Sequence, residues 1–343
     1  MSSLIGYRFL SARAADQLVA GIPAAARLAH SHAAALPGTP LMLVLGGSDT
    51  MASLTRAEIA RLAPGLVVEA TAPDGAIMLP GEALPDAVTI RAVQANLAAP
   101  PTLPADPRTA LRAAAKAIIR STAKPGDGII SRHCNRPLSQ VASAVLLRFT
   151  WIRPGHASLL TLLTAMLMLA CLMTGTQSGL VAGAVLFQIA SIVDGIDGEI
   201  ARATFRTSKA GASLDSLIDA FSNVAFLGGA GYNYWLQGRA EDAMIAMVAA
   251  GVMAIGLCLL GTLAFQKEGI VHFDGAKRIQ EQTSSATGRL LRDLTSRDFY
   301  CFALLVAAIA GVLDVAIQVF LGAVIVWLVA IISLLLRRNP GTK

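Results

Sequence analysis

The sequence predicts a small N-terminal α/β domain followed by an all-α integral membrane domain, and three observations lead to this. Hydrophobic residues make up 55% of the 343 residues and charged residues only 15%, which is unlike an ordinary soluble protein. Residues 157–338 consist largely of apolar runs that suit membrane-spanning helices. The first hundred residues instead alternate short apolar runs with helix-like segments.

Residues 1–107 are predicted to form the α/β domain, on the cytoplasmic side of the membrane. The alternating pattern rests on three strand-like runs and one helix-like run: 41–45, 66–69, 87–90 and 55–62. The proline-rich stretch APPTLPADP at 99–107 marks the end of this region, because clustered prolines favour turns and linkers.

Residues 108–156 are predicted to be basic amphipathic helices at the membrane surface. In residues 108–122, apolar positions recur at helical spacing with Arg112, Lys116 and Arg120 interleaved. A second amphipathic segment, 127–155, carries more arginines and ends near Trp151, as expected for an interfacial helix that leads into a first span.

Six membrane spans are expected. They are placed at 157–174, 178–203, 210–236, 242–265, 298–313 and 315–336. Lys and Arg gather before the first span, in the 202–209 and 266–297 connections, and in the tail after residue 337. Because cytoplasmic loops are enriched in these residues, a multi-pass protein of the inner (cytoplasmic) membrane is predicted, with both termini in the cytoplasm.

Four acids stand out within this apolar part of the chain: Asp194, Asp197, Asp215 and Asp219. No charged residue occurs in 157–193 before them or in 220–238 after them. A carboxylate inside a membrane domain is costly unless it faces a cation or a polar cavity, so its first interpretation is functional. Spacings of three and four residues place the acids on one face of each of two adjacent helices. We therefore expect the four carboxylates to converge at the cytoplasmic end of a helix pair.

Such a cluster would repel itself without cations, and oxygen ligands of this kind suit Mg²⁺ or Mn²⁺. Small residues nearby, Gly198, Ala201 and Gly211, leave room for a nucleotide close to the backbone. Arg202 adds a fixed positive charge suited to phosphate. A pair of divalent cations here would stabilise the attacking and leaving oxygens of a phosphoryl transfer.

The eight positions form the pattern D-x2-D-G-x2-A-R-x8-G-x3-D-x3-D from Asp194 to Asp219. This pattern resembles the signature of the CDP-alcohol phosphotransferase (CDP-alcohol phosphatidyltransferase) family, over about residues 125–338. The resemblance implies a homodimeric membrane enzyme of phospholipid or related polar-lipid biosynthesis. It would move a substituted phosphate from a CDP-activated alcohol, such as CDP-diacylglycerol or a CDP-inositol-like donor, to an acceptor hydroxyl and release CMP. It also implies that the four acids bind two divalent metal ions and that Asp219 accepts the acceptor's proton.

The N-terminal domain resembles the nucleotidyltransferase part of inositol-phosphate cytidylyltransferase fusions. Such domains need a glycine-rich loop after the first strand, with Arg and Lys to hold a nucleoside triphosphate. The candidate stretch, LVLGGSDTMASLTRAE at 43–58, departs from that pattern, and no lysine precedes Lys116. A degenerate domain without catalytic activity is therefore expected.

Two alternatives are weighed against this interpretation. The net charge of +6 could suggest nucleic acid, but the cations lie between apolar spans, so no nucleic-acid partner is expected. A non-catalytic membrane carrier or scaffold could keep the same acids as an ion site. Metal-dependent release of CMP would distinguish an enzyme from such a carrier.

Overall fold

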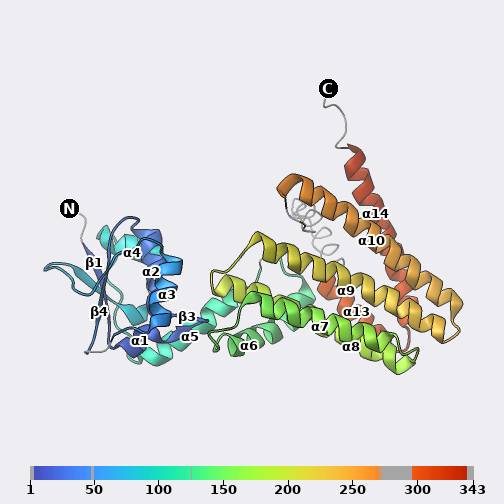
Figure 1. Ribbon diagram of the computed structural model, residues 1–343, viewed down its shortest axis with the longest axis horizontal. Coiled ribbons are helices and arrows are strands. Elements are labelled where there is room, and N and C mark those ends of the chain that lie inside the picture. The colour runs from blue at the N-terminus through green and yellow to red at the C-terminus, as the bar shows by residue number, and fades with distance from the viewer. Residues whose placement is uncertain (1–3, 48–49, 125, 270, 272–295, 338–343) are drawn as a thin grey trace. The chain divides into compact units, whose positions relative to one another are not determined.

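The computed structural model describes residues 4–47, 50–124, 126–269, 271 and 296–337, and it divides into two compact units (Figure 1). The first contains residues 1–122, 143–152 and 202–205, and the second contains 123–142, 153–201 and 206–343. We describe each unit by itself.

The first unit is built on a four-stranded parallel sheet in the order β5-β4-β1-β6. The strands are β1 (Ile5–Phe9), β4 (Leu41–Leu45), β5 (Val68–Glu69) and β6 (Ile77–Pro80). A two-stranded antiparallel ribbon joins β2 (Leu18–Val19) to β3 (Ile22–Pro23). The two central strands, β1 and β4, are almost wholly apolar and buried, as expected of parallel strands covered by helices.

The helices of this unit are α1 (Ala12–Asp16), α2 (Ala24–Ala35), α3 (Ser53–Leu62), α4 (Ala87–Gln94) and α5 (Pro107–Ser121), with a 3₁₀ turn η1 (Gly81–Ala83). Figure 1 shows α2, α3 and α4 on the same side of the sheet. Alanines on the buried face of α2 let it lie close against the strands, and Leu28, Tyr7 and Phe9 fill the space between them. The predicted α/β character of this region is confirmed.

Two details of the predicted domain are wrong. Residues 87–90, expected as a strand, begin α4, because the Asp86 side chain accepts a hydrogen bond from the Thr89 amide at 2.8 Å and caps a helix there. The first parallel strand is β1, which the sequence pattern missed. The glycine-rich stretch at 43–58 therefore begins in β4 and does not follow the first strand.

The second unit is helical. Its long helices are α7 (Pro154–Leu172), α8 (Gln177–Ala203), α9 (Lys209–Leu236), α10 (Ala240–Glu268), α13 (Arg297–Ile309) and α14 (Leu313–Arg337). Before them come a π-helical turn η2 (Ser131–Asn135) and α6 (Arg136–Leu146). The last residues of α6 and of α8 are assigned to the first unit.

Among the described residues, four helices are long and apolar enough to cross a membrane: α7, α8, α10 and α14. The α9 helix has the length, but Lys209, Asp215 and Asp219 interrupt its first half. The α13 helix has 13 residues and is therefore about 20 Å long, shorter than the hydrocarbon core of a bilayer. An integral membrane protein is supported, and the count of six spans stays a prediction.

The long helices pack through small residues and aromatic contacts. Gly229 of α9 lies against Leu172 of α7, and Asn233 donates a hydrogen bond to the Leu172 carbonyl at 2.6 Å. Phe187 of α8 and Phe226 of α9 stack with their ring centres 4.4 Å apart. Close backbone approach and buried hydrogen bonds are the usual means of joining helices in a membrane. These contacts fix α8 and α9, which carry the acids, relative to each other.

Candidate metal and phosphotransfer site

The end of α8 and the start of α9 carry the four acids, and the turn between them is short. Phe205 adopts a left-handed backbone conformation (φ 53°), and the Arg206 amide donates to the Ala201 carbonyl at 2.9 Å, which closes the end of α8. Ser208 then caps α9 by accepting a hydrogen bond from the Gly211 amide at 3.0 Å. The two acidic segments therefore lie on consecutive helices joined by a short, hydrogen-bonded turn.

Three of the four acids form a compact group. One carboxylate oxygen each from Asp194, Asp215 and Asp219 lies within 4.8 Å of the others. Asp197 is outside this group. Its side chain is buried, and it accepts a hydrogen bond from the Ser158 hydroxyl of α7 at 2.7 Å.

Arg297, at the start of α13, completes the group and was missed by the sequence analysis. Its Nη1 lies 3.2 Å from Asp194 Oδ2 and also forms an ion pair with Asp219. Its Nε and Nη2 atoms are buried, and no hydrogen-bond partner for them occurs in the described structure. The only signal in the sequence was an arginine at the boundary between a basic loop and an apolar run. That signal also fits a topology charge.

Arg297 is positioned by a polar cluster that ties the start of α13 to α8. The neighbouring Asp298 accepts hydrogen bonds from Asn135 at 2.7 Å and from Ser191 at 2.8 Å. Asn135 in turn accepts one from Gln188 at 2.8 Å. Three of these four side chains are almost fully buried, so the cluster fixes the start of α13.

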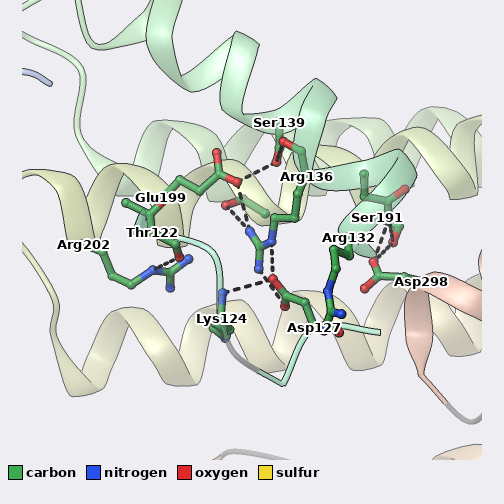
Figure 2. A network of polar contacts seen from close by, with 12 residues as sticks. Thr122, Lys124, Asp127, Arg132, Arg136, Ser139, Ser191, Glu199, Arg202 and Asp298 are labelled. Atoms are coloured by element: carbon green, nitrogen blue, oxygen red, sulfur yellow. Dashed lines mark hydrogen bonds and ion pairs between the residues drawn. The ribbon is translucent and has the colours of Figure 1, made fainter. Parts of the chain in front are cut away.

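A second network supports the end of α8 (Figure 2). Arg136 of α6 forms ion pairs with Asp127 at 2.7 Å and with Glu199 at 3.0 Å, and Ser139 donates to the same Glu199 oxygen at 2.6 Å. Burial raises the pKa of Asp127, but the bonds from Arg136 outweigh it and hold that pKa below its ordinary value. Glu199 lies on α8 two residues after Asp197, so this network fixes the helix that carries Asp194 and Asp197.

The other predicted site residues lie near the turn. Gly198 and Ala201 are half-buried on α8, and Gly211 is exposed in the first turn of α9. Arg202, which was expected to meet phosphate, belongs to the first unit, where its Nε donates to the Thr122 carbonyl at 2.8 Å (Figure 2). The roles predicted for these four residues stay predictions.

The donor set of the acid group fits a hard divalent cation. Carboxylate oxygens are the ligands that Mg²⁺ and Mn²⁺ prefer, and three of them converge here from two helices. The guanidinium of Arg297 between two of these acids shows that the group stabilises positive charge. Asp194, Asp215 and Asp219 would hold such an ion, with Asp197 one helical turn along α8 from Asp194.

These features define an integral membrane protein with a group of acids, at one end of a helix pair, whose oxygens suit a divalent cation. The family model for CDP-alcohol phosphatidyltransferase matches residues 154–335, more than half of the 343 residues. The chain therefore belongs to this family. The resemblance drawn from the acid pattern is thereby confirmed.

Several proteins named "Bifunctional IPC transferase and DIPP synthase" are similar to part of the chain. The protein from Thermococcus kodakarensis is 38% identical over 118 residues, 34% of this chain and 26% of the relative. The protein from Aquifex aeolicus is 44% identical over 103 residues, 30% and 22% of the two chains. The one from Rubrobacter xylanophilus is 36% identical over 137 residues, 40% and 30%. The alignments thus span less than a third of each relative's length.

Proposed function

We propose that this protein moves a substituted phosphate from a CDP-activated alcohol to an acceptor hydroxyl at the acid group of α8 and α9. The observation that carries the proposal is the convergence of Asp194, Asp215 and Asp219 within a family of CDP-alcohol phosphotransferases. Bound Mg²⁺ or Mn²⁺, two ions in this proposal, would neutralise charge on the diphosphate and on the leaving phosphate.

The chain's own residues have distinct tasks in this scheme. The acceptor oxygen attacks the β-phosphorus, the bond between this phosphorus and the bridging oxygen breaks, and that oxygen leaves with CMP. Asp219 accepts the hydroxyl proton, while Asp194, Asp197 and Asp215 serve first as metal ligands. Gly198, Ala201 and Gly211 leave space for the nucleotide, and Arg202 contributes positive charge toward phosphate. Such positioned charges account for most of phosphoryl-transfer catalysis.

The substrate and the membrane arrangement are also proposals. Both CDP-diacylglycerol and a CDP-inositol-like molecule fit a reaction of phospholipid or related polar-lipid biosynthesis. The resemblance of the N-terminal domain to inositol-phosphate cytidylyltransferases favours the second. We further propose a homodimer in the inner (cytoplasmic) membrane, with six spans in each chain. Both termini and the acid group face the cytoplasm.

The test is release of CMP by the full-length protein in proteoliposomes, with CDP-diacylglycerol and CDP-inositol offered separately. Lipid extract supplies the acceptor, and mass spectrometry identifies the phosphodiester formed. We expect one CMP for each phosphodiester, with Mn²⁺ present and not with EDTA. A carrier or scaffold would bind the CDP-alcohol and release no CMP, which would contradict the proposal.

A further inference from the structure

A basic cavity of about 640 Å³ lies within the first unit and shares no residue with the acid group. It is bordered by α1, β2 and α5, and by residues of the 143–152 segment. Five cations and no carboxylate occur among its described lining residues, and the cations are Arg13, Arg108, Arg112, Lys116 and Arg148. Five like charges around one cavity repel one another unless an anion lies among them.

The α5 helix fixes three of these cations in a row. Arg108, Arg112 and Lys116 follow each other at intervals of four residues and so share one helical face. Leu111 of the same helix is 1% exposed and packs in the core of the unit. Asp106 caps the start of α5 through the Arg108 and Thr109 amides, at 3.1 and 3.2 Å. The row is therefore part of the folded domain.

Within the described structure, the side chains of the five lining cations make no hydrogen bond and no ion pair. Two acids lie close by, but both carboxylates have other partners. Asp106 accepts from Thr109 and from the cap amides. Asp16, which borders the adjoining pocket, accepts from the Ala52 amide and the Thr55 hydroxyl. The positive charge of the cavity is thus left for a ligand.

The apolar residues of the lining limit what that ligand can be. They include Leu18, Ile119 and Leu147, of which the last two are buried, while the five cations are exposed. A volume of about 640 Å³ lies in the range of small-molecule sites. Arginine and lysine are the side chains that most often hold phosphate. A ligand with one or more phosphates and an uncharged body matches both the cations and the apolar residues of this lining.

We infer that this cavity binds a phosphate-bearing ligand, either the headgroup of an anionic lipid or a soluble phosphorylated molecule. If α5 attracted the ligand only as a basic helix at the membrane surface, all of its cations would contribute alike to the affinity. In a defined binding site, the lining cations contribute and Arg120 does not, because it lies on the same helix but outside the cavity. This difference makes Arg120 the matched control.

The experiment is isothermal titration calorimetry of the full-length protein in a neutral detergent containing EDTA, so that no divalent ion bridges a phosphate to the acid group. Inorganic pyrophosphate is the soluble probe. Dihexanoyl phosphatidic acid is the lipid probe, with dihexanoyl phosphatidylcholine as its zwitterionic counterpart. We expect saturable binding of one probe molecule per chain, weakened by added NaCl. The double variant R112Q/K116Q should bind about tenfold or more weakly, and R120Q should bind as the wild type does.

Each result of this titration either supports or overturns the inference. Binding of pyrophosphate with this pattern supports a soluble ligand, and binding of phosphatidic acid alone supports a lipid headgroup. If neither probe binds, or if R120Q weakens binding as much as the double variant does, the inference is overturned. Size-exclusion elution and thermal unfolding check that each variant is folded. The single variant R13Q, at an exposed position on α1, replaces the double variant if that one does not fold.

Discussion

Asp219 and Asp194 share the guanidinium of Arg297, yet we assign them different tasks. Asp219 is one helical turn further along α9 than Asp215, away from the turn that joins α8 to α9. In the proposed topology that direction leads into the membrane, from which a lipid-borne hydroxyl would enter. This placement makes Asp219 the proposed base.

Asp219→Asn is expected to lower turnover by about 10² to 10⁴ while CDP binding persists, because asparagine cannot accept a proton at neutral pH. Asp194→Asn should weaken both CDP binding and turnover, because it removes a proposed metal ligand. The measurement pairs Mn²⁺-dependent CDP binding with single-turnover CMP release. If Asp219→Asn kept more than about a tenth of the wild-type rate, Asp219 would be a ligand and not the base.

His32 on α2 gives the first unit a pH dependence. It is 1% exposed and hydrogen-bonded to the Tyr7 hydroxyl, and burial lowers its pKa below the ordinary 6.5. As the pH falls below about 6.5, the unfolded chain gains a proton that the folded chain does not. The free energy of unfolding should then drop by up to about 1.4 kcal/mol per pH unit until the folded pKa is reached.

Hydrogen exchange of the α2 amides in the full-length protein, corrected for intrinsic rates, measures this effect between pH 7.5 and 5.5. We expect weaker protection at pH 5.5 in the wild type and in His30→Gln, a control on the same helix. His32→Gln should show little difference between the two pH values. Equal protection of wild-type α2 at both pH values would contradict this account of His32.

At the scale of residues, the sequence could predict the acids but not their partners. Fixed spacing on two helices was enough to bring Asp194, Asp215 and Asp219 together. The contact of Asp197 with Ser158 and that of Arg297 with the acids join residues far apart in the chain. Helical periodicity holds no information on which distant side chains meet, so these contacts needed the structure.

At the scale of elements, the network of α6 is expected to hold α8 in place. Arg136 compensates two largely buried carboxylates, Asp127 and Glu199, whose side chains are 11% and 1% exposed. Arg136→Gln would remove the ion pair that each of them forms with Arg136, at a cost on the order of 3 kcal/mol in the free energy of unfolding. Arg132→Gln removes only an exposed hydrogen bond, from Arg132 Nη2 to the Asp127 carbonyl at 3.1 Å, and leaves both ion pairs in place, so it should change the free energy of unfolding by less than about 1 kcal/mol.

Thermal unfolding in detergent, followed by circular dichroism, compares these variants. The midpoint should fall by several degrees for Arg136→Gln and stay near the wild-type value for Arg132→Gln. If both variants unfolded at the wild-type temperature, the network would not support α8.

The helices of the second unit followed from their apolar runs, whereas the short strands did not. Charges and glycines at the ends of long runs delimit α7, α8, α10 and α14 closely. β1 and β6 are short, and Gly6 and Pro80 weaken their strand pattern. The four residues at 87–90 are too few to show a helical or a strand periodicity. They form a helix because Asp86 caps the start of α4.

At the scale of the whole molecule, the basic connections predict which side of the membrane each turn faces. The turn between α8 and α9 should be cytoplasmic, and the turn between α9 and α10 should face the opposite side. Most of the basic 266–297 connection lies outside the described residues. The prediction therefore depends on the shorter turns.

Single-cysteine labelling of intact cells with a membrane-impermeant maleimide tests this placement, in a background that lacks the four native cysteines. Glu241→Cys, exposed at the start of α10, should be labelled. Thr207→Cys, exposed in the turn between α8 and α9, should react only after the membrane is permeabilised. The reverse pattern would place the acid group on the opposite side of the membrane and contradict the proposed topology.

The central claim is that the acids of α8 and α9 perform a metal-dependent phosphotransfer. Its most direct test compares CMP release by the wild type and Asp215→Asn in matched proteoliposomes across a Mn²⁺ titration. The account predicts release by the wild type that rises and saturates with Mn²⁺, and release by Asp215→Asn that stays at background. Undiminished, Mn²⁺-independent release by Asp215→Asn would show that the chemistry occurs elsewhere in the chain.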